Sequence, residues 1–222
     1  MIDNPYRPGA GHSPPFLAGR AEELRQFRKL LQQKEITQNI VLTGLHGVGK
    51  TVLMDDAYRS LALKEGWIWV GTNLSESAFI DELALSTRLL TDLAVFTSGL
   101  ALKESEATMG FRSKPRVVER RLDFDTLRDY FGGQPGLTSD RLKATLELAL
   151  TAARSVGREG ILFAYDGAQV VQDRKDKDQY PLAMFLETFQ SIQRKGFRCL
   201  LLLTGLPTLF PKLVESRTYA ER

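Results

Sequence analysis

Residues 44–51 read Gly44-Leu45-His46-Gly47-Val48-Gly49-Lys50-Thr51, which is the pattern G-x-x-x-x-G-K-[ST]. Its glycines allow the tight turns that bring backbone N–H groups close to a chain of phosphates. The Lys50 ammonium would lie against the β- and γ-phosphates, and the Thr51 hydroxyl is a ligand for Mg²⁺. The octet, here called the phosphate loop, therefore predicts a site for ATP and Mg²⁺ in which all eight residues contact the nucleotide.

The sequence on either side of the phosphate loop agrees with this prediction. The apolar run at residues 39–43 predicts a buried strand, and residues 51–58 have the spacing of a helix that continues to about residue 64. A strand, a glycine-rich loop and a helix N-terminus in this order form a geometry that binds polyphosphate. A chance glycine turn would have no reason to occur in this setting.

The rest of the chain alternates between apolar runs and helical periodicity. The runs predict strands at 67–72, 161–166 and 198–204, and the periodicity predicts helices at 21–33, 141–155 and 181–195. Strands that are almost continuously apolar and alternate with helices indicate a parallel sheet covered on both faces. The expected fold class is therefore α/β, with a phosphate-loop core.

Composition sets broader bounds on the protein. The chain has 222 residues, of which 43% are hydrophobic and 26% charged, as in an ordinary globular domain. Its net charge of +3 is weak evidence for a nucleic-acid partner, because the charges are spread along the chain. No apolar run reaches the roughly 20 residues of a membrane span, and the N-terminus has no apolar signal segment. The single cysteine, Cys199, permits no internal disulfide, which fits a location in the cytoplasm.

Two segments differ from the rest of the predicted domain. Residues 1–18 hold four prolines and two glycines, so we expect an extended leader before a domain at residues 19–222. Residues 98–136 are rich in glycine and mixed charge and predict a long, partly mobile insert. The insert contains a basic cluster, formed by Arg112, Lys114, Arg116, Arg120 and Arg121. A solvated loop accounts for this cluster more simply than a contact with nucleic acid, and both interpretations remain open.

Asp166 follows the apolar strand predicted at 161–166. A phosphate loop needs a carboxylate at such a strand end to hold Mg²⁺ through its water shell. An aspartate at the end of a strand can also serve only to form a turn. Together with the octet, the position favours the metal, so Thr51 and Asp166 are the predicted magnesium ligands and Lys50 and Asp166 are predicted catalytic residues.

The residue after Asp166 affects the expected rate of hydrolysis. Many phosphate-loop ATPases have a glutamate directly after the strand-end aspartate, but this chain has Gly167. Glycine has no side chain to orient or deprotonate water, and removing a general base costs about 10²–10⁴-fold in rate. Gln169 is polar and close in sequence. We therefore expect firm nucleotide binding and weak turnover.

Three more residues are candidates for contact with the γ-phosphate. Thr204 ends the strand predicted at 198–204, where its hydroxyl could bond the γ-phosphate or its water, or only the local backbone. Arg217 and Arg222 lie near the end of the chain. An arginine at a subunit edge can reach a neighbour's γ-phosphate as a finger. One of these two is the expected finger; otherwise, both are surface residues.

Five segments, taken in order, resemble one family. They are FLAGRAEEL at 16–24, the phosphate loop, DGAQ at 166–169, LTGLP at 203–207 and ESRTYAER at 215–222. Together they are similar to bacterial AAA+ ATPases of the origin-recognition/STAND-like group. This resemblance implies an AAA+ core with Gly19 and Arg20 near the adenine, Thr204 as the first sensor and Arg217 or Arg222 as a finger acting on a neighbouring subunit. It also implies a fifth strand, a helical lid and often a winged helix beyond residue 222, so the lid is expected to be missing here.

Two functions remain open at this point. In the first, the chain is an ATP-dependent switch or motor that assembles as a homo-oligomer through its ATP site, with a possible DNA or protein partner. In the second, it is a nucleotide-binding regulatory module, possibly associated with DNA, whose bound ATP sets conformation or assembly without turnover. The Asn-Lys-x-Asp motif of GTPases does not occur in the sequence, which argues against a guanine-specific enzyme.

Overall fold

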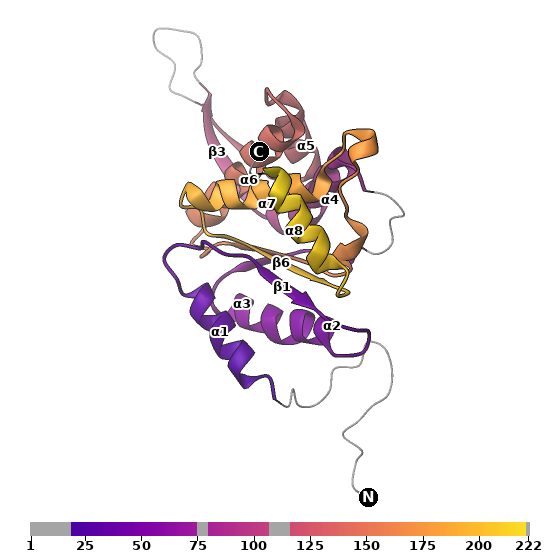
Figure 1. Ribbon diagram of the computed structural model, residues 1–222. Helices are drawn as coiled ribbons and strands as arrows, with labels where there is room; N and C mark the ends of the chain where they lie inside the picture. The colour runs from indigo at the N-terminus through magenta and orange to yellow at the C-terminus, as the bar shows by residue number, and fades with distance from the viewer. Residues whose placement is uncertain (1–18, 75–79, 107–115, 221–222) are drawn as a thin grey trace, which may run out of the picture.

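We describe the protein from a computed structural model, in which the described residues are 19–74, 80–106 and 116–220 (Figure 1). The N-terminal part holds α1 (Ala21–Leu31), β1 (Ile40–Thr43), a helix in three sections, α2 (Lys50–Val52), η1 (Leu53–Tyr58) and α3 (Arg59–Lys64), and β2 (Ile68–Val70). The middle part holds α4 (Glu82–Thr97), β3 (Ala101–Glu106), β4 (Arg116–Arg121), α5 (Phe124–Gly133) and α6 (Thr138–Ser155). The last part holds β5 (Ile161–Tyr165), η2 (Ala168–Val170), η3 (Lys175–Lys177), α7 (Pro181–Arg194), β6 (Cys199–Gly205) and α8 (Leu209–Ala220).

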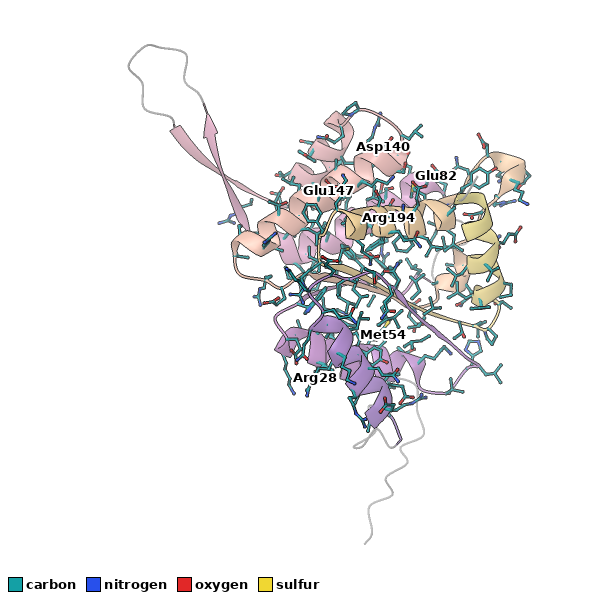
Figure 2. The ribbon with its side chains drawn as sticks, turned by 60° about the vertical axis from the view of Figure 1, so that its left-hand side comes forward. Arg28, Met54, Glu82, Asp140, Glu147 and Arg194 are labelled. Atoms are coloured by element: carbon teal, nitrogen blue, oxygen red, sulfur yellow. The ribbon has the colours of Figure 1, made fainter. Side chains whose placement is uncertain are left out.

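The described central sheet has four parallel strands in the order β1-β6-β5-β2. Figure 1 shows α1, α2 and α3 on one face of this sheet and α4 to α8 on the other. In Figure 2, Met54 accordingly lies on the first side and Arg194 on the second. The predicted α/β fold with helices on both faces is confirmed.

The side chains of β5 and β6 explain why both faces are covered. Successive side chains of a strand point to opposite faces. In β5, Ile161, Phe163 and Tyr165 enter the core beneath α4 to α8, while Leu162 and Ala164 enter the core shared with α1 and α3. All five side chains are buried. A strand that is apolar at every position can be satisfied only between two layers of helices, as the sequence indicated.

Strand β1 departs from the expected continuous burial. Its residues alternate between partly buried and exposed, and Val41 is 37% exposed. Among the described strands, β1 pairs only with β6, so it forms an edge of the sheet. The apolar run alone could not distinguish this edge from the interior of the sheet.

The segment 98–136 contains more regular structure than the sequence indicated. Strands β3 and β4 form an antiparallel hairpin that projects from the body of the protein (Figures 1 and 2). Helix α5 follows, capped by Asp123, whose side chain accepts from the Thr126 N–H at 2.9 Å. Leu127 and Phe131 of α5 are buried in the larger core. This part of the expected insert therefore belongs to the packed domain, and residues 107–115 lie outside the described residues.

Three sequence predictions concern parts that the structure leaves out. The leader at 1–18 and the candidate finger Arg222 lie outside the described residues, as do Arg112 and Lys114 of the basic cluster. Arg217 lies in α8, but its side chain is not described. Within the described segments, no helix is both long and apolar enough to span a bilayer.

Candidate functional site

The phosphate loop, Asp166 and Thr204 meet because three neighbouring strands end at the same edge of the sheet. In the sheet register, Thr43 of β1 pairs with Gly205 of β6, and Tyr165 of β5 pairs with Leu203 of β6. The phosphate loop leaves β1 at this edge, and the Gly44 N–H donates to the Gly205 carbonyl at 3.3 Å. The site therefore lies at the carboxyl ends of parallel strands, where open α/β sheets bind ligands.

The backbone of the phosphate loop has the conformation that its glycines were expected to allow. Gly47 and Gly49 have φ angles of 80° and 84°, in the left-handed region that favours glycine. Gly49 is also the N-cap of the helix that begins at Lys50. The side chains of Leu45, His46 and Val48 are exposed. What the loop offers a ligand is thus a turn of backbone at a helix N-terminus, a favourable place for phosphate.

Lys50 is held by the loop itself. Its ammonium donates to the carbonyls of Gly44 and Leu45, each at 2.9 Å. These contacts hold the lysine charge against the first two residues of the phosphate loop. A phosphate entering the loop would offer the ammonium a stronger, charge-assisted partner than these neutral carbonyls.

Asp166 is the centre of the hydrogen bonds in the site. The Thr51 hydroxyl donates to its Oδ2 at 2.6 Å, and the Thr204 hydroxyl donates to its Oδ1. The Gly167 N–H also donates to Oδ1, at 2.8 Å. Burial raises the pKa of Asp166, but the hydrogen bonds from Thr204, Thr51 and Gly167 and the Lys50 charge outweigh it, and the net pKa lies below its usual value. The carboxyl group is therefore ionised at neutral pH.

The donor set fits a magnesium ion. Mg²⁺ prefers oxygen ligands and is commonly bound by one or two protein groups together with substrate phosphates and water. The Thr51 hydroxyl and the Asp166 carboxylate supply such oxygens within hydrogen-bond distance of each other. No group of three His, Cys, Asp or Glu side chains suited to a metal occurs in the described parts of the chain. An ion here would thus take its other ligands from phosphate and water.

The Thr204 hydroxyl has a partner that neither of the two sequence-based interpretations named, the carboxylate of Asp166. The side chain of Thr204 is fully buried, and its hydroxyl bonds the carboxylate of Asp166 rather than the backbone. It lies next to the metal-binding candidate, where a first sensor would be placed. The contact of Thr204 with a γ-phosphate stays a prediction.

Arg20 contacts the phosphate loop. Arg20 donates to the Val48 carbonyl at 3.3 Å and forms an ion pair with Glu23 at 2.9 Å. Gly19 has a φ angle of 77° directly before α1. The position of Gly19 and Arg20 near the adenine, which the resemblance implied, stays a prediction.

The residue after Asp166, Gly167, has no side chain, and its backbone conformation disfavours any residue that has one. Gly167 has a φ angle of 71°, in the left-handed region. The side chain of Gln169 does not fill this gap, because its Oε1 accepts from the Leu206 N–H at 3.1 Å. Neither Gly167 nor Gln169 therefore offers a side chain that could act as a general base.

Two groups of residues that support the site could not be predicted from the sequence. The first is Arg88 of α4, which donates to the Thr72 hydroxyl and pairs with Asp92 at 3.2 Å. It fixes the end of β2, where the Thr72 carbonyl accepts from the Asp166 N–H at 3.2 Å. Burial raises the pKa of Asp92, while Arg88 acts in the opposite direction. Thr72 and Asp166 are far apart in sequence, so only the fold shows that Arg88 is connected to Asp166 through Thr72.

The second support connects helix α8 to the loop after Asp166. Lys212 donates to the Gln169 carbonyl at 2.6 Å and to Oε1 of Gln172 at 3.0 Å. Burial lowers the pKa of Lys212. On the same helix, Ser216 donates to Asp173 at 2.5 Å. Helix α8, which carries Arg217, is thus attached to the segment that begins at Asp166.

Comparisons with known proteins agree with the fold. Residues 17–214 match the family model of the AAA ATPase domain. Cdc6p from Pyrobaculum aerophilum has a similar structure, with a TM-score of 0.55 at 16% identity, over 96% of this chain and 46% of that chain. The Aeropyrum pernix ORC2 protein, solved as ADPNP and ADP complexes, gives a TM-score of 0.51 at 18% identity, over 95% of this chain and 48% of that chain. The chain thus spans about half the length of these two proteins, and at such identities the likeness concerns the fold. No curated protein sequence matches the chain.

Proposed function

The chain belongs to the AAA ATPase domain family, and we propose that it binds Mg-ATP at residues 44–51 and acts as a nucleotide-controlled, oligomeric switch with slow turnover. One observation carries this proposal: the fold brings the phosphate loop, the ionised carboxyl of Asp166 and the Thr204 hydroxyl to one edge of the sheet. The Aeropyrum pernix ORC2 protein was solved with ADPNP and ADP, which makes adenine nucleotide the first ligand to test.

Binding follows from the loop and from Lys50. Backbone N–H groups at residues 44–51 would donate to the phosphates, and the N-terminus of the following helix favours negative charge. Lys50 would exchange its two carbonyl partners, Gly44 and Leu45, for phosphate oxygens. Arg20, held against Val48, would lie on the side of the loop where the base binds. When bound, Mg²⁺ would neutralise phosphate charge, with Thr51 and Asp166 as its protein ligands.

Slow turnover follows from the chemistry available after Asp166. Asp166 carries three hydrogen bonds and a lowered pKa, so it is a poor proton acceptor. Gly167 has no side chain, and Gln169 is bonded to the backbone of the next loop. Water bound beside a γ-phosphate would thus find no base at residues 166, 167 or 169, and the ATP-bound form would persist.

A switch also needs a way to transmit the state of the nucleotide. Helix α8 is bonded through Lys212 to Gln169, close to Asp166 along the chain. A shift of Asp166 on metal binding would therefore act on α8 and on Arg217, a proposed finger for a neighbouring subunit. Arg222 is the second candidate for this finger.

The experiment has two measurements on the same protein, nucleotide affinity and phosphate release. We expect a fluorescent ATP analogue to bind with Mg²⁺ and phosphate release to stay far below the roughly 10 s⁻¹ that is the median for enzymes. Light scattering with and without Mg-ADPNP should show assembly that depends on nucleotide and is weakened by Arg217→Ala or by Arg222→Ala. Failure to bind ATP would refute the proposed site, and rapid release would refute slow turnover.

The second candidate function is a nucleotide-binding module without catalysis. The left-handed backbone at Gly167 favours it, because that conformation disfavours the glutamate that a hydrolytic enzyme would carry there. A single-turnover assay with radiolabelled ATP separates the two functions. Slow but measurable conversion to ADP supports the switch with turnover, and intact ATP after many hours supports the module.

A further inference from the structure

A pocket lies at the opposite edge of the sheet from the phosphate loop. Gly160 and Arg198 directly precede β5 and β6, so this pocket is at the amino ends of the strands. Strand β6 has seven residues, and at about 3.3 Å per residue the two sites are roughly 20 Å apart. The pocket has a volume of about 500 Å³, within the roughly 300–1,000 Å³ of small-molecule sites. We call it the amino-edge pocket, and its lining includes Lys34, Leu150, Arg154, Arg158, Phe197 and Arg198.

One wall of the amino-edge pocket is fixed by Arg198. Its guanidinium lies over the Trp67 ring at 5.1 Å, donates to the Leu31 carbonyl at 2.5 Å and pairs with Glu159. Its Nε is buried and has no hydrogen-bond partner. Gly160 leaves room for this arrangement, because a Cβ there would lie 2.3 Å from the Arg198 carbonyl. The wall is therefore preorganised and keeps one donor unused.

The other cations of the pocket are unpaired. The side chains of Lys34, Arg154 and Arg158 are exposed and form no ion pair or hydrogen bond with any described residue. Two carboxylates, Glu35 and Glu159, also line the pocket, and Glu159 is already paired with Arg198. The lining keeps a net positive charge, which favours an anionic ligand.

The apolar part of the lining narrows the ligand class further. Leu150 is buried, and Phe197 is partly buried and packs against the larger core. We propose that the amino-edge pocket binds the phosphate group of a small phosphorylated metabolite that has an apolar or aromatic portion. The bounded volume favours a small molecule over a nucleic-acid strand, whose backbone needs a groove that continues along the surface.

Phenyl phosphate is a suitable probe, because it has one phosphate and one ring. Titrated into ¹⁵N-labelled protein saturated with Mg-ADPNP, it should shift the backbone amides of residues 154–160 and 196–198. We expect Arg158→Gln and Arg154→Gln each to weaken binding by about tenfold, the loss of one charge-assisted hydrogen bond. Arg25→Gln is the matched control: it removes the same charge from an exposed residue of α1 that pairs with Glu22 and should leave the affinity unchanged.

Four results would overturn the proposal or part of it. Equal weakening by Arg25→Gln and Arg158→Gln would show a general charge effect. Shifts centred on residues 44–51 would place the probe in the phosphate loop, and displacement of phenyl phosphate by a short oligonucleotide would identify a nucleic-acid surface. Inorganic phosphate should bind more weakly than phenyl phosphate, and equal affinity would refute the apolar portion of the ligand. Each variant changes an exposed side chain, and a thermal unfolding curve like that of the wild type would confirm that its fold is retained.

Discussion

The clearest test of slow turnover is a pair of substitutions at Gly167. Glutamate at this position restores the carboxylate that many phosphate-loop ATPases carry, and alanine is its control. Both side chains meet the same backbone, whose φ angle of 71° costs a non-glycine residue about 1–2 kcal/mol. For a chain of this size, each 1 kcal/mol lowers Tm by about 2–4 °C. Both variants should therefore melt about 2–8 °C below the wild type, whatever the role of the carboxylate.

A comparison of the phosphate-release rates of the two variants then measures the effect of the carboxylate alone. A positioned general base contributes about 10²–10⁴-fold, so Gly167→Glu should exceed Gly167→Ala in steady-state phosphate release by that factor. Gly167→Ala should match the slow wild type, because neither has a base. The reasoning would be refuted if the two variants hydrolysed ATP at equal rates. It would also be refuted if the wild type already equalled Gly167→Glu.

Three further predictions test the surroundings of the site. The pKa of Asp166 is lowered in the folded state, so its contribution to stability is present above the unfolded pKa of about 3.9 and is lost as pH falls through the folded value. Urea unfolding from pH 7 to 2 should therefore show a stability difference between wild type and Asp166→Asn that shrinks below about pH 4; a constant difference would contradict this. Gly71→Ala would place a Cβ 1.8 Å from the Ala164 carbonyl oxygen, and should cost at least about 3 kcal/mol in urea unfolding, a loss that an unchanged midpoint would disprove. Leu127→Ala should lower the free energy of unfolding by about 2–5 kcal/mol, because Leu127 is fully buried. A loss below about 0.5 kcal/mol, typical of a surface position, would show that α5 is not part of the core.

The sequence predicted those parts of the fold whose signals are local. The apolar runs located all four strands of the central sheet. For β2, β5 and β6 the reason is that a strand buried on both faces is apolar at every position, whereas the edge position of β1 was not predicted. The phosphate loop and Asp166 carried their chemistry in residue type and spacing. The contact between Thr204 and Asp166 follows once β5 and β6 are known to be neighbours.

Other features depend on contacts that no local pattern contains. The hairpin β3–β4 and helix α5 were not predicted, because the glycines and mixed charges of that region are typical of a loop. Leu127 of α5 is buried because α5 packs against α4 and α6, which are distant in sequence or not yet placed when the sequence is read alone. Arg88 reaches Thr72 only through the fold. The left-handed conformation of Gly167 is also a property of the folded chain. Because of this conformation, this position differs from that of a glutamate-bearing ATPase in its backbone as well as in its side chain.

A crystal structure of this protein with ADPNP and Mg²⁺ would test the central claim most directly. The account predicts phosphates bonded to the backbone amides of residues 44–51, the Lys50 ammonium moved from the Gly44 and Leu45 carbonyls to a phosphate oxygen, and a magnesium ion between Thr51 and Asp166. A nucleotide bound elsewhere, or a phosphate loop still closed on Lys50 at saturating ligand, would contradict it.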